Sequence, residues 1–326
     1  MKIQHTFLVL LFLLPYGLFA QEEDGNPDFR FTGFLQQHFS NGTNPDDPWA
    51  FSIRRMRAGV QGQVHENVSF VVMAGAVEPP DGTPQMINAF VDVRINPFLS
   101  VRAGQFFVPF GIEGQESITR NPAIDRSLVV RRLNTHRMFR DIGVQLNGSH
   151  GILGYQLALI NGAGANAAGR IDPKDIAGRI SVAPFHNLEI GFSGQFGNYV
   201  PETMPDTHAG RNRYGIDINL GRPGLQLRSE IIYRRDELPL DQEQNYLGGY
   251  ILGDVKVLTD VSLTGRFEYL ESERESSITT MGSYMLGMNY MVYEYVRLSA
   301  NYEMRYDGFT TNGREHLLLV QLQLAI

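Results

Sequence analysis

Cysteine is missing from all 326 residues, and lysine occurs only as Lys2, Lys174 and Lys256. The chain therefore has no thiol nucleophile and no disulfide bridge to staple it. Its stability must come from a large core, a metal or a closed sheet. The 28 Lys and Arg residues stand against 35 Asp and Glu residues. This mildly acidic balance argues against a nucleic-acid partner, because such partners usually require a strongly basic face.

Long apolar runs are lacking after residue 20, where no stretch approaches the roughly 20 apolar residues of a transmembrane helix. Residues 1–20 differ from the rest. They begin with the basic Lys2, continue with apolar Phe7–Leu14 and break at Pro15–Ala20, which ends on a small residue. This pattern predicts a cleaved secretory signal peptide, which leaves residues 21–326 as one exported domain.

After the signal peptide the chain alternates apolar and polar residues almost throughout. Such a period of two predicts β-strands. Most runs approach the roughly 9–11 residues that a tilted strand needs to cross a bilayer, whereas ordinary globular strands have about five or six. The pattern gives sixteen strands, at about 29–40, 49–64, 68–78, 85–95, 99–108, 138–149, 152–162, 174–183, 188–198, 211–220, 225–235, 244–257, 261–271, 279–291, 295–306 and 314–326.

The connections between these strands alternate between long and short. Tight turns such as His150-Gly151 and Arg222-Pro223-Gly224 are separated by longer segments such as Asn41–Pro48 and Tyr199–Gly210. An even strand count, with short turns on one side and longer loops on the other, is required of a bacterial outer-membrane barrel. The sequence therefore predicts an all-β fold, a transmembrane antiparallel β-barrel of 16 strands with both ends on the periplasmic side.

The two faces of each strand differ in polarity, as the run at 225–235 illustrates. One face carries Leu225, Leu227, Ile231 and Tyr233, and the other carries Gln226, Arg228, Glu230 and Arg234. Sixteen strands leave a lumen wide enough for water. We therefore expect the apolar face to meet lipid and the charged face to line a channel.

The second strand needs an irregularity to satisfy this rule. Phe51 and Ile53 share one parity, whereas Met56 and Ala58 share the other. A one-residue bulge near Arg54 reconciles the two halves.

Enzyme motifs are lacking. The eight histidines form no HxH or HExxH spacing for a metal, and no GxxxxGK[ST] loop is present to hold phosphates. The sequence therefore indicates no cofactor, no metal and no enzymatic activity, although spacing alone leaves an enzyme built on a barrel, or an adhesin, as a remote alternative.

One long segment, Pro109–Arg137, interrupts the alternation. At about 29 residues it is well above the usual connection length, and such loops are usually functional or disordered. In the strand count it is the third outer loop, and we expect it to fold into the pore. Its arginines outnumber its three acids and are candidates for a basic constriction: Arg120, Arg126, Arg131, Arg132 and Arg137.

Further arginines are expected on the adjoining lumen wall. The candidates are Arg55, Arg57, Arg102 and Arg179. Arginine keeps its charge at any relevant pH, and its planar fork matches oxyanions. A row of such groups would bind an anion at several sites, each weak enough to release it. The other interpretation is ordinary charge balance, because lumen acids such as Asp92, Asp217 and Glu230 have the parity to pair with these arginines.

Several stretches together resemble the phosphate-selective porin O and P family. They are FSIRRMRAGVQGQV (51–64), VRAGQFFVPFG (101–111), FRDIGVQLNG (139–148), YQLALINGAG (155–164) and KDIAGRI (174–180). In that family, the strand that ends in Pro-Phe-Gly leads into a long loop folded into the pore. The matching residues here are Pro109-Phe110-Gly111.

The resemblance implies a trimeric porin in the outer membrane of a Gram-negative bacterium, passing small anions such as phosphate. The residues alone also leave open a general or carbohydrate-uptake porin without anion preference, in which tyrosine-rich strands would offer stacking surfaces.

Overall fold

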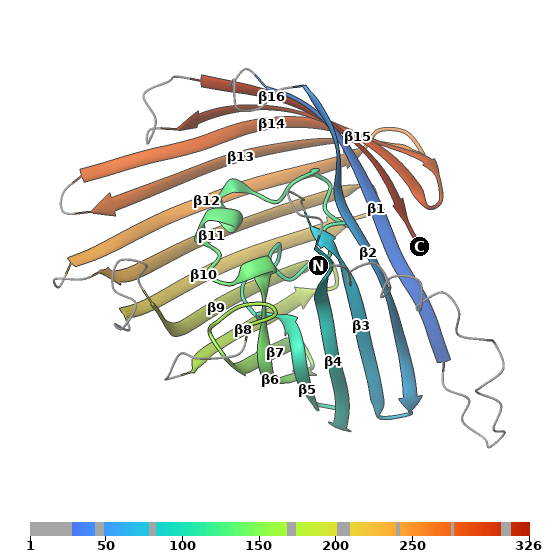
Figure 1. Cartoon of the computed structure of the whole chain (residues 1–326), viewed down its shortest axis with the longest axis vertical. Helices are drawn as coiled ribbons and strands as arrows, with labels where there is room; N and C mark the ends of the chain where they lie inside the picture. The colour runs from blue at the N-terminus through green and yellow to red at the C-terminus, as the bar shows by residue number, and fades with distance from the viewer. Residues whose placement is uncertain are drawn as a thin grey trace, which may run out of the picture.

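The computed structural model describes residues 28–42, 49–77, 83–167, 174–200, 209–238, 242–274, 277–307 and 314–326. Sixteen strands follow one another around a single sheet, each antiparallel to its neighbours. The last strand, β16, pairs with the first, β1, so the sheet closes into a barrel (Figure 1). The predicted fold is confirmed.

The elements have the following bounds: β1 Asp28–Gly42, β2 Ala50–His65, β3 Val68–Val77, β4 Gln85–Asn96, β5 Leu99–Phe107, α1 Leu128–Leu133, the 3-10 turn η1 Arg137–Phe139, β6 Arg140–His150, β7 Leu153–Ile160, β8 Asp175–Phe185, β9 Leu188–Tyr199, β10 Ala209–Arg222, β11 Leu225–Leu238, β12 Gln242–Lys256, β13 Val261–Arg274, β14 Ser277–Tyr293, β15 Val296–Asp307 and β16 Arg314–Ala325.

The two faces of the wall have the predicted polarity. On β11 the outward Ile231 is 56% exposed and Tyr233 is 37% exposed, whereas the alternating Arg228 and Glu230 are each only 2% exposed. A soluble barrel would bury the apolar side chains instead. The exposed apolar face is the one that lipid covers in a membrane barrel.

The short turns lie where they were predicted, but two of the expected longer loops are mostly strand. The pattern predicted loops over 236–243 and 272–278, whereas β11 continues to Leu238 and β13 to Arg274. Cross-strand polar pairs such as Arg235 with Glu243 extend these hairpins. Polar pairs stabilise a ladder as apolar ones do, so the end of apolar alternation marked the end of the lipid-facing band and not of the strand.

The predicted bulge is present on β2. Gln36 of β1 pairs with Arg55, and the next residue, Gln37, pairs with Ile53, so Arg54 is the extra residue of the bulge. The bulge lets consecutive residues Arg54 and Arg55 both reach the same loop carboxylate, Asp125.

The predicted signal peptide, residues 1–20, lies outside the described residues. The α-helix α1 has six residues. Among the described helices, none has the length and apolar character needed to cross a membrane.

Candidate functional site

The segment 108–139, between β5 and β6, lies against inward-facing side chains on many strands and is drawn in green inside the ring of strands (Figure 1). It begins where the Val108 N–H donates to the Phe139 carbonyl. It then forms hydrogen bonds with side chains on β2, β9, β10, β11, β13, β14, β15 and β16. Contacts with strands so widely spaced around the barrel hold the segment across the lumen.

The Pro-Phe-Gly motif explains how the segment leaves the wall. Gly111 has φ of +65°, and a Cβ there would lie 2.2 Å from Glu230 Oε2, so only glycine fits. The close approach allows the Gly111 N–H to donate to Ser193 Oγ at 3.0 Å and the Glu113 N–H to donate to Glu230 Oε1 at 2.7 Å. Phe110 lies under the guanidinium of Arg213, with 4.0 Å between Cζ and the ring centre.

The helix α1 is fixed at both ends. Ser127 Oγ accepts from the Val130 N–H at 3.0 Å, and the Leu128 N–H donates to the Glu268 carboxylate of β13. At the other end, the Arg132 carbonyl accepts from Arg234 at 3.2 Å, and the Leu133 carbonyl accepts from Arg213 at 3.5 Å. Wall arginines therefore satisfy carbonyls that a helix leaves without partners at its end.

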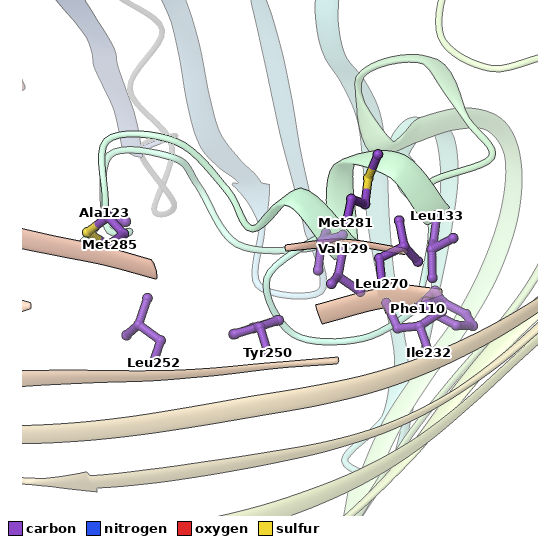
Figure 2. Close-up of a cluster of buried hydrophobic side chains, with 11 residues drawn as sticks. Phe110, Ala123, Val129, Leu133, Ile232, Tyr250, Leu252, Leu270, Met281 and Met285 are labelled. Carbon is purple, nitrogen blue, oxygen red and sulfur yellow. The ribbon is translucent and has the colours of Figure 1, made fainter. Parts of the chain in front are cut away.

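An apolar cluster holds the helix against the wall (Figure 2). Val129 and Leu133 are fully buried against inward-facing side chains of β11–β14, which include Ile232, Leu252 and Leu270. The sequence predicted that the charged face lines the channel, and this apolar patch is an exception to that prediction. Where the wall meets α1, its lining is apolar, because a segment packed inside a barrel needs a core as any other packed element does.

Six arginines gather on the opposite flank of the segment, and we call them the arginine cluster: Arg54, Arg55 and Arg57 of β2, Arg126 and Arg131 of the segment, and Arg140 at the start of β6. Arg57 faces the charges of Arg55 and Arg126. Arg140 faces those of Arg57 and Arg126. The cluster therefore concentrates like charge.

Asp125 is the one carboxylate that pairs directly with the cluster among the described residues. Its Oδ1 lies 3.0 Å from Arg55 Nη2 and 3.4 Å from Arg54 Nη2. Burial by itself would raise the pKa of the Asp125 carboxyl, but Arg54, Arg55 and Arg131 outweigh it and hold that pKa below its usual range. Asp125 therefore stays ionised at neutral pH and ties the segment to β2.

Three members of the cluster stack on aromatic rings and have no carboxylate partner among the described residues. Arg57 is 8% exposed, lies over Phe34 at 5.1 Å and forms no hydrogen bond with the described part of the chain. Arg140 donates to Asn88 and to the Met138 carbonyl and lies 3.7 Å from the Phe107 ring centre. Arg126 donates to the carbonyls of Glu113 and Glu116. Arg57 and Arg140 therefore keep their positive charge without a paired carboxylate, whereas Glu113 partly compensates the charge of Arg126.

Arg126 keeps its positive charge near neutral pH. Burial, opposed in part by Glu113 and strengthened by Arg55, lowers the pKa of Arg126 to about 10. Arg126 is therefore still protonated at pH 7. Towards the lumen the cluster presents Arg131, which is exposed, and Arg54, whose side chain is 26% exposed. Such a group can attract an anion and offer it guanidinium donors.

The remaining candidate arginines lie elsewhere. Arg102 forms a two-point pair with Asp92 at 2.8 and 2.9 Å, and Arg179 pairs with both Glu189 and Asp217. Arg120 and Arg132 are exposed but outside the cluster. The side chain of Arg137 lies outside the described residues.

Sequence reasoning left Arg54 unassigned and missed Arg140. Because Arg54 lies at the bulge, its position in the alternation does not say which face of the sheet it occupies. Arg140 is the first residue of β6, so no alternating strand residues precede it from which its face could be inferred. The available signal for Arg54 was its place among the three arginines of residues 54–57. Among the described residues, no group of three or more His, Asp or Glu side chains could hold a metal ion.

The fold is shared with solved outer-membrane proteins. A loop-deletion variant of OmpT from Vibrio cholerae matches with a TM-score of 0.74 and 12% identity, over 92% of this chain and 99% of that one. An anion-selective porin from Comamonas acidovorans matches with 0.73 and 9% identity, over 92% and 100%. The outer-membrane channel DcaP of Acinetobacter baumannii matches with 0.70 and 11% identity, over 95% and 100%.

A search of curated proteins gives no match. The family model for phosphate-selective porin O and P matches residues 28–222, more than half of the chain. That range contains the Pro-Phe-Gly motif, the segment that crosses the lumen and every arginine of the cluster. Together with the closed sixteen-stranded barrel, the match shows that this chain belongs to the phosphate-selective porin O and P family of Gram-negative outer-membrane channels.

Proposed function

We propose that the chain is a passive diffusion channel for small anions, phosphate among them, and that segment 108–139 narrows its pore. The arginine cluster carries this proposal. Arg54 and Arg55 share Asp125, while Arg57, Arg126 and Arg140 form no ion pair with a described carboxylate. A surplus of fixed positive charge at a narrow point raises the local concentration of anions and repels cations.

The exposed members of the cluster would meet the permeating ion, and the buried ones would supply field. Arg131 and Arg54 reach the lumen, while Arg57, Arg126 and Arg140 stand behind them on aromatic rings. One unit charge at about 4 Å contributes about 1 kcal/mol in a watery medium. Each arginine thus binds the ion weakly enough to release it.

The exposed tyrosines of the wall weigh against a carbohydrate channel, and Tyr246, which lines an inner cavity, is an exception to this placement. Tyr214, Tyr233, Tyr284 and Tyr302 are all more than a third exposed on the outer face of the wall. They cannot stack against a sugar inside the lumen, and they fit the aromatic girdles of a membrane barrel.

Selectivity is tested by the reversal potential of the purified channel in planar bilayers under a potassium chloride gradient. We expect a potential with the sign of chloride permeation. A potential of the cation-selective sign would overturn the anion channel. The absence of any conductance would overturn the channel and favour an enzyme or adhesin on a barrel scaffold.

Phosphate is tested in the same bilayers. If phosphate passes the arginine cluster, adding it should reduce the chloride current, because phosphate carries more negative charge than chloride and stays bound to the arginines for longer. Substituting Arg131→Gln should weaken that block. Equal block by phosphate and by a large inert anion would exclude phosphate preference while leaving anion selectivity intact.

Assembly as a homotrimer is part of the proposal. One similar structure, OmpT of Vibrio cholerae, is described in a trimer form. Chemical cross-linking in native membranes should give a species of three chains, whereas a ladder that ends at one chain would exclude the trimer.

A further inference from the structure

A cavity lies apart from the arginine cluster. It has a volume of about 810 Å³ and is bordered by α1 and by strands β11–β14. Its lining includes the charged Arg132, Arg234 and Arg274, the ring of Tyr246, and the apolar Leu270 and Met281. It lies towards the ends of β11 and β13 that extend past the apolar band, on the side of the long connections.

The positive charge in this cavity is only partly compensated. Arg234 is paired with Asp236, whose carboxylate also binds Arg211 at 3.0 Å. Arg132 has its carbonyl held by Arg234, and its exposed side chain forms no ion pair with a described carboxylate. The guanidinium of Arg132 is therefore available to a ligand.

The same cavity offers apolar surface that an inorganic ion would not use. The Tyr246 ring is half-buried, and Arg234 stacks on it with 5.0 Å between Cζ and the ring centre. Leu270 and Met281 lie at the base, only 3% and 4% exposed, where they join the apolar cluster that holds α1, so the Tyr246 ring is the more accessible apolar surface. In Figure 2, Leu270 and Met281 lie beside Val129 and Leu133. Removal of apolar surface from water favours a ligand with a hydrocarbon body.

Hydroxyl groups complete the lining. Ser272, Ser277 and Thr279 border the cavity, and Ser272 Oγ already accepts from Gln244 at 2.6 Å. A pocket with a few convergent polar groups on an apolar base is typical of sites for small organic molecules.

We propose that this cavity binds small organic anions that carry a ring or a hydrocarbon body besides a carboxylate or phosphoryl group. The acidic group pairs with Arg132, and the body lies against Tyr246 above Leu270 and Met281. The inference rests on the proposed anion channel, to which it adds a selective site on the side of the long connections. Organic anions are concentrated there before they reach the arginine cluster.

Benzoate and acetate test this site, because both carry one carboxylate and only benzoate has a ring. Each is added to channels carrying chloride current, and the concentration that halves the current is measured. A stacked ring contributes about 1 kcal/mol, so we expect benzoate to act at roughly a fivefold lower concentration than acetate. Equal concentrations for the two anions would overturn the proposal.

Substitutions in the cavity show whether the difference between benzoate and acetate arises there. Tyr246→Ala should raise the half-blocking concentration of benzoate close to that of acetate and leave the acetate value unchanged. Tyr246→Phe should keep the difference between the two concentrations. Arg132→Gln should weaken both anions. The matched control is Arg235→Gln, because Arg235 follows Arg234 on β11 but is exposed and pairs with Glu243. A difference that survives Tyr246→Ala, or that is lost in Arg235→Gln, would overturn the proposed site.

The reversal potential of each channel, measured before either probe is added, separates the two proposals. An anion-selective channel that treats benzoate and acetate alike retains the proposed function and excludes this site. A cation-selective channel excludes the proposed function itself.

Discussion

Two flanks of the lumen use arginine in opposite ways. On β8, β11 and β13, Arg179, Arg234 and Arg266 each form an ion pair with a carboxylate of the wall, and Arg228 forms a close ion pair with Glu116 of the crossing segment. In the arginine cluster, Arg54 and Arg55 share Asp125, and Arg57 and Arg140 form no ion pair with a described carboxylate. The first flank holds the structure together, and the second accumulates charge.

The difference shows that arginine content alone does not identify a binding site. Removing one member of a buried ion pair leaves an uncompensated charge and is strongly destabilising. Removing a member of an under-compensated cluster relieves repulsion. Substitutions on the two flanks should therefore separate stability from selectivity.

The largest effect is expected at Glu268. Its carboxylate accepts from Arg266 Nε at 2.7 Å, from Ser283 Oγ at 2.9 Å and from the Leu128 N–H of α1. Glu268→Gln leaves Arg266 buried without its partner, so we expect a loss of about 3–5 kcal/mol in stability. Thermal unfolding in detergent measures this loss. Glu271→Gln, on the same strand but facing Tyr269, should change the midpoint little.

A smaller loss is expected for Leu133→Ala. Leu133 is fully buried in the apolar cluster between α1 and the wall. Truncating such a side chain costs about 2–4 kcal/mol. Because the lost packing loosens segment 108–139 from the wall, single-channel recordings should show a larger and noisier conductance. Recordings identical to those of the original channel would show that the segment does not narrow the pore.

An intermediate effect is expected from pH. The pKa of Arg126 is lowered to about 10, so its charge is lost as the pH rises through that value. Anion preference should be constant between about pH 5 and pH 8 and should decline as the pH approaches 10. Reversal potentials across this series measure it. A decline centred near pH 6.5, the usual pKa of histidine, would point to a different group.

The smallest effect on stability is expected at Arg57. Because no described group accepts a hydrogen bond from it and neighbouring arginines repel it, Arg57→Gln should change stability by about 0.5 kcal/mol or less. Chemical denaturation measures the difference. A loss comparable to that of Glu268→Gln would mean that the cluster is structural and would remove the contrast between the flanks.

The barrel followed from the sequence because alternation and turn spacing are local properties. Strand ends were less predictable where polar pairs such as Arg235 with Glu243 extend a hairpin past its apolar residues. The bulge at Arg54 was predictable because it shifts the parity of its neighbours.

The candidate site was only partly predictable. Arg55, Arg57, Arg126 and Arg131 meet in one cluster, whereas Arg102 and Arg179 are occupied by acids. Pairing depends on distances between strands that are far apart in the sequence. The apolar lining at Leu252 and Ile232 went unnoticed for the same reason, since only the position of α1 explains it.

The most direct test of the central claim compares the reversal potentials of Arg57→Gln and Arg179→Gln. Both substitutions remove one positive charge from the lumen, but Arg57 belongs to the cluster and Arg179 is paired with Asp217 and Glu189. We predict that Arg57→Gln lowers the anion-to-cation permeability ratio by about fivefold, as expected for about 1 kcal/mol. Arg179→Gln should change the ratio much less. Equal changes in the two variants, or a larger change in Arg179→Gln, would contradict the claim that the arginine cluster sets selectivity.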